Sequence, residues 1–181
     1  MKKPYTFFDH RHKFAVWAAA RATQRGWKGA TTKIIKDALE NCGVRQFTSK
    51  ASSRNTRLKK FERLYREWCK KICSFLKKRH VQGVTYGRAA KIVAIYLKSM
   101  LILSGSEYSP LARVAHPPVD ATLLENLPSE IKAKLPENVK RWTKLKENDY
   151  YDGLIKPPRA FLGRDEPSWK LEEYFDPVPK G

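Results

Sequence analysis

The chain has 181 residues, of which 41% are hydrophobic and 12% aromatic, so it is long enough to bury the core of one folded domain. It carries 37 Lys and Arg against 18 Asp and Glu, which gives a formal net charge of +19. Small soluble domains usually carry a net charge of roughly 2 to 8 in magnitude, so the excess indicates an acidic partner.

The charge is distributed unevenly along the chain. Residues 1–100 hold 25 Lys and Arg against 5 Asp and Glu, a net of +20, and residues 101–181 hold the remaining 12 and 13, a net of −1. One half therefore carries the whole excess. This favours a basic face that binds a polyanion over charge that serves only solubility.

Composition also excludes several classes. No apolar run approaches the roughly 18 residues that a membrane span needs, and the first residues lack the apolar core of a signal peptide. Three cysteines without framework spacing indicate a reducing compartment. We expect a cytoplasmic, nucleoid-associated monomer with no membrane partner.

The predicted elements are helical throughout, because apolar residues recur at helical spacing and no useful period-2 pattern occurs. We expect an all-α fold with a compact domain over 1–150 and an extended, proline-rich tail over 151–181, packed on that domain.

Asp9 and Asp120 each stand where a helix N-cap belongs. Residues 44–57 and 104–118 are predicted to be loops. Helices are predicted over 10–25, 32–42, 55–80, 89–103 and 137–147, with a further one after Asp120.

The most informative region is the glycine-bearing turn at 83–88 and the apolar helix that follows it. On a helical wheel Arg88, Lys91 and Lys98 fall within about 80° of one another. A cationic stripe on an apolar helix is costly unless it faces solvent or a charged ligand. Neighbouring cations lower each other's pKa, so one lysine could keep a useful fraction of the neutral amine that a Schiff-base nucleophile needs. A carboxylate opposite that lysine would accept and return protons. Spacing alone favours phosphate contact over nucleophilic chemistry for Lys91.

Several histidines, cysteines and one tryptophan could serve the function, but each could also have a purely structural role. His10 and His12 are either phosphate-binding or catalytic groups, or polar residues of a first helical turn. Trp68 is either a core residue or a pocket wall on which a flipped base stacks. Cys69, Cys73 and His80 have the spacing of a metal trio, but buried thiols on a core helix are far more common, so we expect no metal.

The segment from Gly87 to Lys98, followed by Pro117-Pro118-Val119-Asp120, resembles the helix-hairpin-helix DNA glycosylases. The archaeal 8-oxoguanine DNA glycosylase/AP lyase group shows a similar turn, a lysine-bearing apolar helix and a Pro-Val-Asp stretch in the same order. The similarity covers about residues 65–124. Trp68 resembles that group's pocket tryptophan.

The resemblance implies that the chain binds double-stranded DNA, flips out a damaged or modified base such as 8-oxoguanine, and cleaves through a lysine Schiff base. Lys91 would be the nucleophile and Asp120 the proton carrier. No four-cysteine iron–sulfur pattern follows the domain, so no cofactor is implied. The base pocket would include Trp68, His10 and Pro118. The DNA contacts would come from Gly83, Thr85, Gly87, Arg88, Lys98, Arg54 and Arg57.

Two other functions stay open at this point. In a non-catalytic nucleic-acid-binding protein the same lysines would only touch phosphates. In a helical ribonuclease or toxin, His10, His12 or His116 would act as the acid and base.

Overall fold

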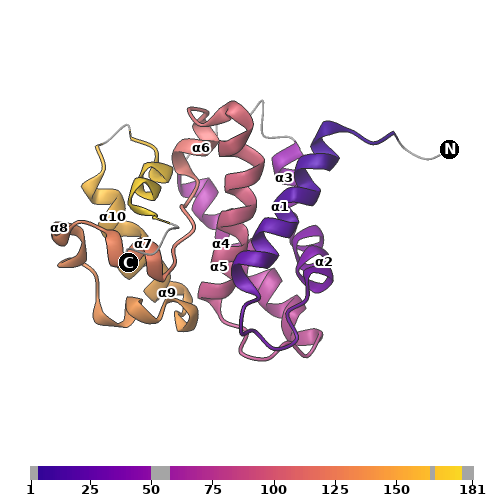
Figure 1. Ribbon diagram of the computed structural model, residues 1–181, viewed down its shortest axis with the longest axis horizontal. Coiled ribbons are helices and arrows are strands. Elements are labelled where there is room, and N and C mark those ends of the chain that lie inside the picture. Colours follow the sequence, from indigo (N-terminus) through magenta and orange to yellow (C-terminus); the bar gives the residue numbers. More distant parts are fainter. Residues whose placement is uncertain (1–3, 50–57, 164–165, 177–181) are drawn as a thin grey trace.

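The computed structural model describes residues 4–49, 58–163 and 166–176, and every regular element within these ranges is a helix (Figure 1). The predicted all-α class is therefore confirmed for the described part of the chain. The first half forms α1 (Phe7–Thr23), α2 (Thr32–Cys42), α3 (Val44–Ser49), α4 (Leu58–Lys78), α5 (Tyr86–Leu97) and the π-type η2 (Lys98–Ser106).

The second half consists of short helical segments. They are α6 (Pro110–Val114), α7 (Ala121–Asn126), α8 (Ser129–Lys132), η3 (Glu137–Lys144), α9 (Glu147–Asp149), η4 (Tyr150–Ile155), α10 (Lys156–Phe161) and η5 (Ser168–Tyr174). Among the described residues no helix is both long and apolar enough to cross a membrane.

Helix α5 is the central element. It packs on α1, α4 and η3, and all of its residues except Arg88 and Ile95 are buried. Ala89, Ala90 and Ala94 have small, fully buried side chains, so the neighbouring helices can approach the backbone of α5 closely. In Figure 1, α1 and α2 lie on one side of α5, and α7 and α10 lie on the other.

Helix caps explain where the first helices begin and end. Thr31 caps α2 by accepting a hydrogen bond from the Ile34 amide at 3.2 Å, and Gly43 ends that helix in the left-handed region at φ 96°. The expectation that Asp9 caps the first helix is wrong. Thr6 is the N-cap, and Asp9 is the third helical residue of a capping box, its carboxylate accepting from the Thr6 amide.

Two segments predicted to be loops contain helices. Within 44–57, the first six residues form α3, because Val44 and Thr48 are buried against the domain. Residues 50–57, which include the predicted DNA contacts Arg54 and Arg57, lie outside the described part of the chain. Within 104–118, Ser109 caps the short α6 by accepting from the Ala112 amide at 3.2 Å.

The prediction of an extended tail from residue 151 is also wrong for the residues described. Pro157 lies in the first turn of α10, where the missing amide hydrogen costs nothing, and Pro167 directly precedes η5. The prolines thus start short helices. Tyr151, Leu154 and Leu171 are buried, so these helices pack on the domain as expected.

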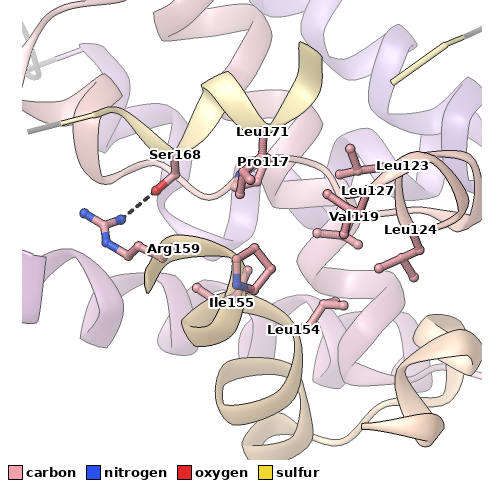
Figure 2. Close-up of a pocket in the computed structure, with 11 residues that line it drawn as sticks. Pro117, Val119, Leu123, Leu124, Leu127, Leu154, Ile155, Arg159, Ser168 and Leu171 are labelled. Carbon is pink, nitrogen blue, oxygen red and sulfur yellow. Dashed lines mark hydrogen bonds between the residues drawn. The ribbon is translucent and has the colours of Figure 1, made fainter. Parts of the chain in front are cut away.

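Figure 2 shows how this C-terminal part holds the segment that precedes α7. Pro117 and Val119 pack among leucines of α7 and apolar residues of η4, α10 and η5, and Arg159 donates a hydrogen bond to Ser168 Oγ at 2.7 Å. The crevice between them has a free volume of about 10 Å³, which holds no more than about one water molecule. It therefore fixes the backbone before Asp120 and leaves no room for a ligand.

A buried histidine lies in the core beside this region. His116 is 1% exposed and packs against the rings of Tyr65 and Phe61, with centroid distances of 4.5 and 5.4 Å. Neither ring nitrogen has a hydrogen-bond partner among the described residues. Burial lowers its pKa to about 3, and the positive charges of Arg159 and Arg66 add to this effect. His116 is therefore neutral at pH 7.

The buried His116 predicts a stability that depends on pH. Its pKa is lower in the folded chain than in the unfolded chain, so the unfolded chain takes up the proton first as the pH falls below 6.5. Between pH 7 and pH 4 this group alone should lower the free energy of unfolding by about 3 kcal/mol. Urea unfolding at both pH values measures the loss. We expect the loss in His116→Phe to be smaller than in the wild type by about 3 kcal/mol, and equal losses in both proteins would contradict the assignment.

Candidate active site

The central helix carries one buried cation that faces a carboxylate. Lys91 Nζ lies 3.1 Å from Asp120 Oδ2, and the two side chains are 8% and 21% exposed. The two residues are 29 positions apart, and they meet because α7 begins beside α5. The structure therefore brings together the two residues that the sequence proposes as nucleophile and proton carrier.

Asp120 is held by two interactions at once. It is the N-cap of α7, as predicted, and its Oδ1 accepts from the Leu123 amide at 3.0 Å while Oδ2 accepts from Lys91. The backbone before it is anchored through Pro117 and Val119. Pro118, a predicted base-pocket residue, is half-buried between these two.

The segment around η3 covers one side of the lysine. The Trp142 ring lies 4.6 Å from Lys91 Nζ, a cation–π distance. The Gly87 amide donates to the Leu145 carbonyl at 3.2 Å, and the Thr85 hydroxyl donates to the Thr143 carbonyl. A Cβ atom at position 87 would stand 1.9 Å from the Trp142 carbonyl oxygen, so only glycine permits this approach.

These contacts correct part of the predicted DNA-binding turn. The Gly87 amide is occupied by Leu145, so it does not face a phosphate as expected, and Thr85 is occupied as the N-cap of α5. Gly83 is exposed at φ 61°, and its carbonyl accepts from the Arg88 guanidinium at 3.3 Å. That guanidinium lies 4.7 Å from the centroid of the Trp27 ring.

The expected single cationic stripe on α5 is also wrong. Arg88 turns toward Trp27, Lys91 toward Asp120, and Lys98 forms an ion pair with Glu172 of η5. Burial raises the pKa of the Glu172 carboxyl, the charge of Asp120 adds to that, and Lys98 opposes it. Lys98 is thus neutralised within the fold and is not a free phosphate contact. Neither Glu172 nor Trp142 was predicted from the sequence as a site residue.

Exposed cations gather instead at the C-terminal end of α4. Lys77, Lys78 and Arg79 are all exposed, and Arg88 follows the same turn. No Asp or Glu occurs between Glu67 and Glu107, so no carboxylate of this part of the chain offsets the charge. A surface of this kind suits the phosphates of a nucleic acid.

The remaining predicted site residues are not brought to Lys91. Trp68 is 3% exposed and packs against Phe47 and Phe61, with ring centroids 4.9 and 6.2 Å away, so it is a core residue with no open face for a base. His10 is exposed near the start of α1, where its Nδ1 lies 3.2 Å from the Tyr5 hydroxyl.

Cys69 and Cys73 lie on α4, and His80 lies just beyond the end of that helix. Within the described ranges no group of three His, Cys, Asp or Glu side chains has the geometry to hold a metal ion. Cys69 is fully buried, and burial raises the pKa of its thiol well above the usual value; burial likewise raises the pKa of Cys73 to about 11. Both cysteines are therefore neutral thiols at pH 7.

A larger cavity adjoins the helix that Asp120 caps. It has a volume of about 670 Å³, within the range of roughly 300–1,000 Å³ that small-molecule sites occupy. Its walls combine apolar groups with Glu125, Lys132 and Glu137. Ala121, which directly follows Asp120, lines it, together with Leu124, Ala133, Leu135, Pro136 and Val139.

The chain matches no protein-family model, no curated protein and no solved structure. A function for this chain is therefore inferred from the geometry of the site itself.

Proposed function

We propose that the protein is a DNA glycosylase with AP lyase activity, with Lys91 as the nucleophile and Asp120 as the proton carrier. The observation that carries the proposal is the buried pair, with Nζ and Oδ2 at 3.1 Å, at the centre of an otherwise apolar helix. Removing two charges from water is costly, and a buried pair is weak evidence for stability. A chemical use accounts for its position better.

The geometry suits amine activation. In the proposed step Asp120, which contacts the ammonium directly, takes up its proton so that the lone pair of Nζ can attack. Asp120 stays oriented during that transfer because the Leu123 amide holds its other oxygen. Trp142 and the surrounding apolar side chains of α5 exclude water.

In the proposed reaction, Nζ of Lys91 attacks C1′ of a flipped nucleotide and the bond from C1′ to the base breaks. The base leaves with that electron pair and takes up a proton. The lone pair of Nζ then forms the imine to C1′ as the C1′–O4′ bond breaks, and O4′ takes up a proton to become a hydroxyl. Loss of a proton from C2′ and departure of the 3′ phosphate complete a β-elimination that nicks the strand. Asp120 takes up and returns the protons at Nζ.

The groups that cover the Lys91 amine determine how a substrate reaches it. Because the Lys91 side chain is 8% exposed and Trp142 lies over it, a sugar reaches Nζ only when that ring moves. Trp142 stands beside the non-helical residue Arg141 (φ −101°, ψ 44°) in a short 3₁₀ segment, a place where a small backbone change moves the ring. The cavity beside α7 offers space for the extruded base.

The basic end of α4, with Arg88, would hold the duplex phosphates. We take α4, the turn over 79–85 and α5 as the helix-hairpin-helix element of the resemblance. Each phosphate contact releases a counterion, so the logarithm of the affinity should fall steeply with the logarithm of salt concentration.

The same geometry argues against the other two functions. A non-catalytic binding module would leave the Lys91–Asp120 pair without a use, since a lysine held against Asp120 does not contact a phosphate. For a ribonuclease, His12 is buried between Tyr96 and Glu40, and His116 is buried with its pKa near 3. Of the three candidate histidines this leaves the exposed His10, whereas the reaction needs both an acid and a base.

The test is trapping with borohydride, which reduces an imine to a permanent amine bond. Labelled duplexes with one 8-oxoguanine or one abasic site are incubated with the full chain and borohydride. We expect a covalent protein–DNA band on the abasic duplex, and a band on the 8-oxoguanine duplex if that base is a substrate. Tight duplex binding without a band on either would assign the chain to the non-catalytic class.

Substitution of Asp120 separates its charge from its capping role. Asn caps helices as well as Asp does, so Asp120→Asn removes the charge and keeps the cap, whereas Asp120→Ala removes both. We expect both variants to lose single-turnover cleavage by roughly 10²- to 10⁴-fold. Asp120→Ala should unfold with about 1 kcal/mol less free energy than Asp120→Asn. Near-normal cleavage by Asp120→Asn would remove Asp120 from the chemistry.

A further inference from the structure

The outer face of α1 carries an exposed row of aromatic and basic side chains. Phe7, Phe14 and Trp17 are 74%, 52% and 53% exposed. His10 and Arg21 are also exposed. With 100° per residue, positions 7, 10, 14, 17 and 21 fall within about 80° of one another. We call this set the α1 stripe. The buried face of α1, with Ala15 and Ala19, packs on α5.

Three large exposed rings in one row are unusual on a soluble surface, where single exposed apolar residues are normal. The rings are close enough to act together, since Phe14 and Trp17 have centroids 5.8 Å apart. At the start of the helix, Lys13 Nζ lies 4.5 Å from the centroid of the Tyr5 ring, which is itself 58% exposed. Aromatic faces and cations thus alternate along α1.

The positive charge of this surface indicates that its binding partner is an anion. The acidic residue of α1, Asp9, is bound by Thr6 and by Arg45 at 2.9 Å. Lys13, Arg21 and Arg25 are exposed. A second copy of a chain with a net charge of +19 would be repelled. An interfacial membrane helix inserts a continuous apolar face and keeps its cations on the opposite face, whereas this row carries His10 and Arg21 among its aromatic residues.

We propose that the α1 stripe binds single-stranded nucleic acid, with unpaired bases stacked on Phe14 and Trp17 and backbone phosphates on Lys13 and Arg21. Bases in a duplex are already stacked on each other, whereas unpaired bases offer free faces to aromatic rings. The row from Phe7 to Arg21 spans about 21 Å, enough for about four or more nucleotides, the lower end of known single-strand sites.

This surface is separate from the Lys91 site. In Figure 1, α1 lies on one side of α5, and α7, which begins at the Asp120 cap, lies on the other. Binding along α1 therefore does not depend on the proposed base excision. A chain without lyase activity would still bind through this row, and a chain without the row would still cleave.

The test measures binding of oligothymidylate, which forms no structure of its own, through quenching of tryptophan fluorescence and by a labelled-strand assay. We expect Phe14→Leu and Trp17→Leu each to weaken binding by about tenfold, because each removes one stacking ring. Trp17→Phe keeps a ring and should restore most of the affinity. Tyr108→Leu, which removes a 63% exposed ring elsewhere, should change nothing.

Duplex affinity and cleavage at an abasic site should stay unchanged in both leucine variants. Three results would overturn the proposal. One is an affinity loss in Trp17→Leu no larger than in Tyr108→Leu. The second is a dimer in sedimentation experiments that Trp17→Leu converts to monomer. The third is binding to anionic phospholipid vesicles that is tighter than to oligothymidylate and is lost in Trp17→Leu.

Discussion

Replacing Lys91 with Gln is expected to abolish borohydride trapping and to lower cleavage at an abasic site by about 10³-fold or more, because the amide has no lone pair able to form an imine. The variant should still bind an abasic duplex with nearly normal affinity, because Lys91 is buried against Asp120 and does not belong to the exposed basic end of α4. Single-turnover cleavage and duplex titration measure the two quantities separately.

Two further substitutions make that result specific. Lys91→Arg keeps the positive charge but forms no imine, so it should be as inactive as Lys91→Gln. Lys77→Gln, at the exposed end of α4, should leave cleavage by saturating protein intact, weaken duplex binding modestly and reduce the salt slope by about one. Normal cleavage by Lys91→Arg would contradict a nucleophilic role, since charge alone would then suffice.

Replacing Gly87 with Ala is expected to cost about 3 kcal/mol of the free energy of unfolding. The new Cβ would stand 1.9 Å from the Trp142 carbonyl oxygen, which is backbone and cannot rotate away. The segment that carries Trp142 must therefore move off α5. This also breaks the hydrogen bond from the Gly87 amide to the Leu145 carbonyl. Urea unfolding monitored by circular dichroism gives the loss.

Gly163→Ala is the matched control. Its Cβ would meet the flexible Glu166 side chain at 3.3 Å, which can shift, so we expect a change within about 0.5 kcal/mol. A Gly87→Ala protein as stable as the wild type would show that η3 does not pack on α5 as described. Because Trp142 covers the lysine, displacement of η3 should also change the rate of cleavage.

The pairing of Lys91 with Asp120 was expected from the resemblance to the glycosylases, since spacing alone favoured phosphate contact for Lys91. The local sequence did predict the N-cap at Asp120, which follows two prolines and precedes a short apolar run. That signal depends on a few neighbouring residues. The all-helical class was predictable in the same way, from the spacing of apolar residues along each segment.

The surroundings of the pair were not predictable, because they depend on contacts across long stretches of chain. Glu172 reaches Lys98 from 74 positions away, and Trp142 comes to Lys91 from a 3₁₀ segment. Helical spacing predicted that Arg88, Lys91 and Lys98 share one face of α5. In the structure they contact three different residues, which are Trp27, Asp120 and Glu172 in that order. The prolines of the C-terminal part suggested an extended tail, although proline also suits a first helical turn.

The account depends most directly on which atom forms the covalent bond with DNA. The borohydride-trapped complex on an abasic duplex is digested with protease and nuclease, and the modified residue is identified by mass spectrometry. The account predicts a sugar remnant attached to Nζ of Lys91 and to no other residue. An adduct on another lysine or on the N-terminal amine, with Lys91 unmodified, would contradict it.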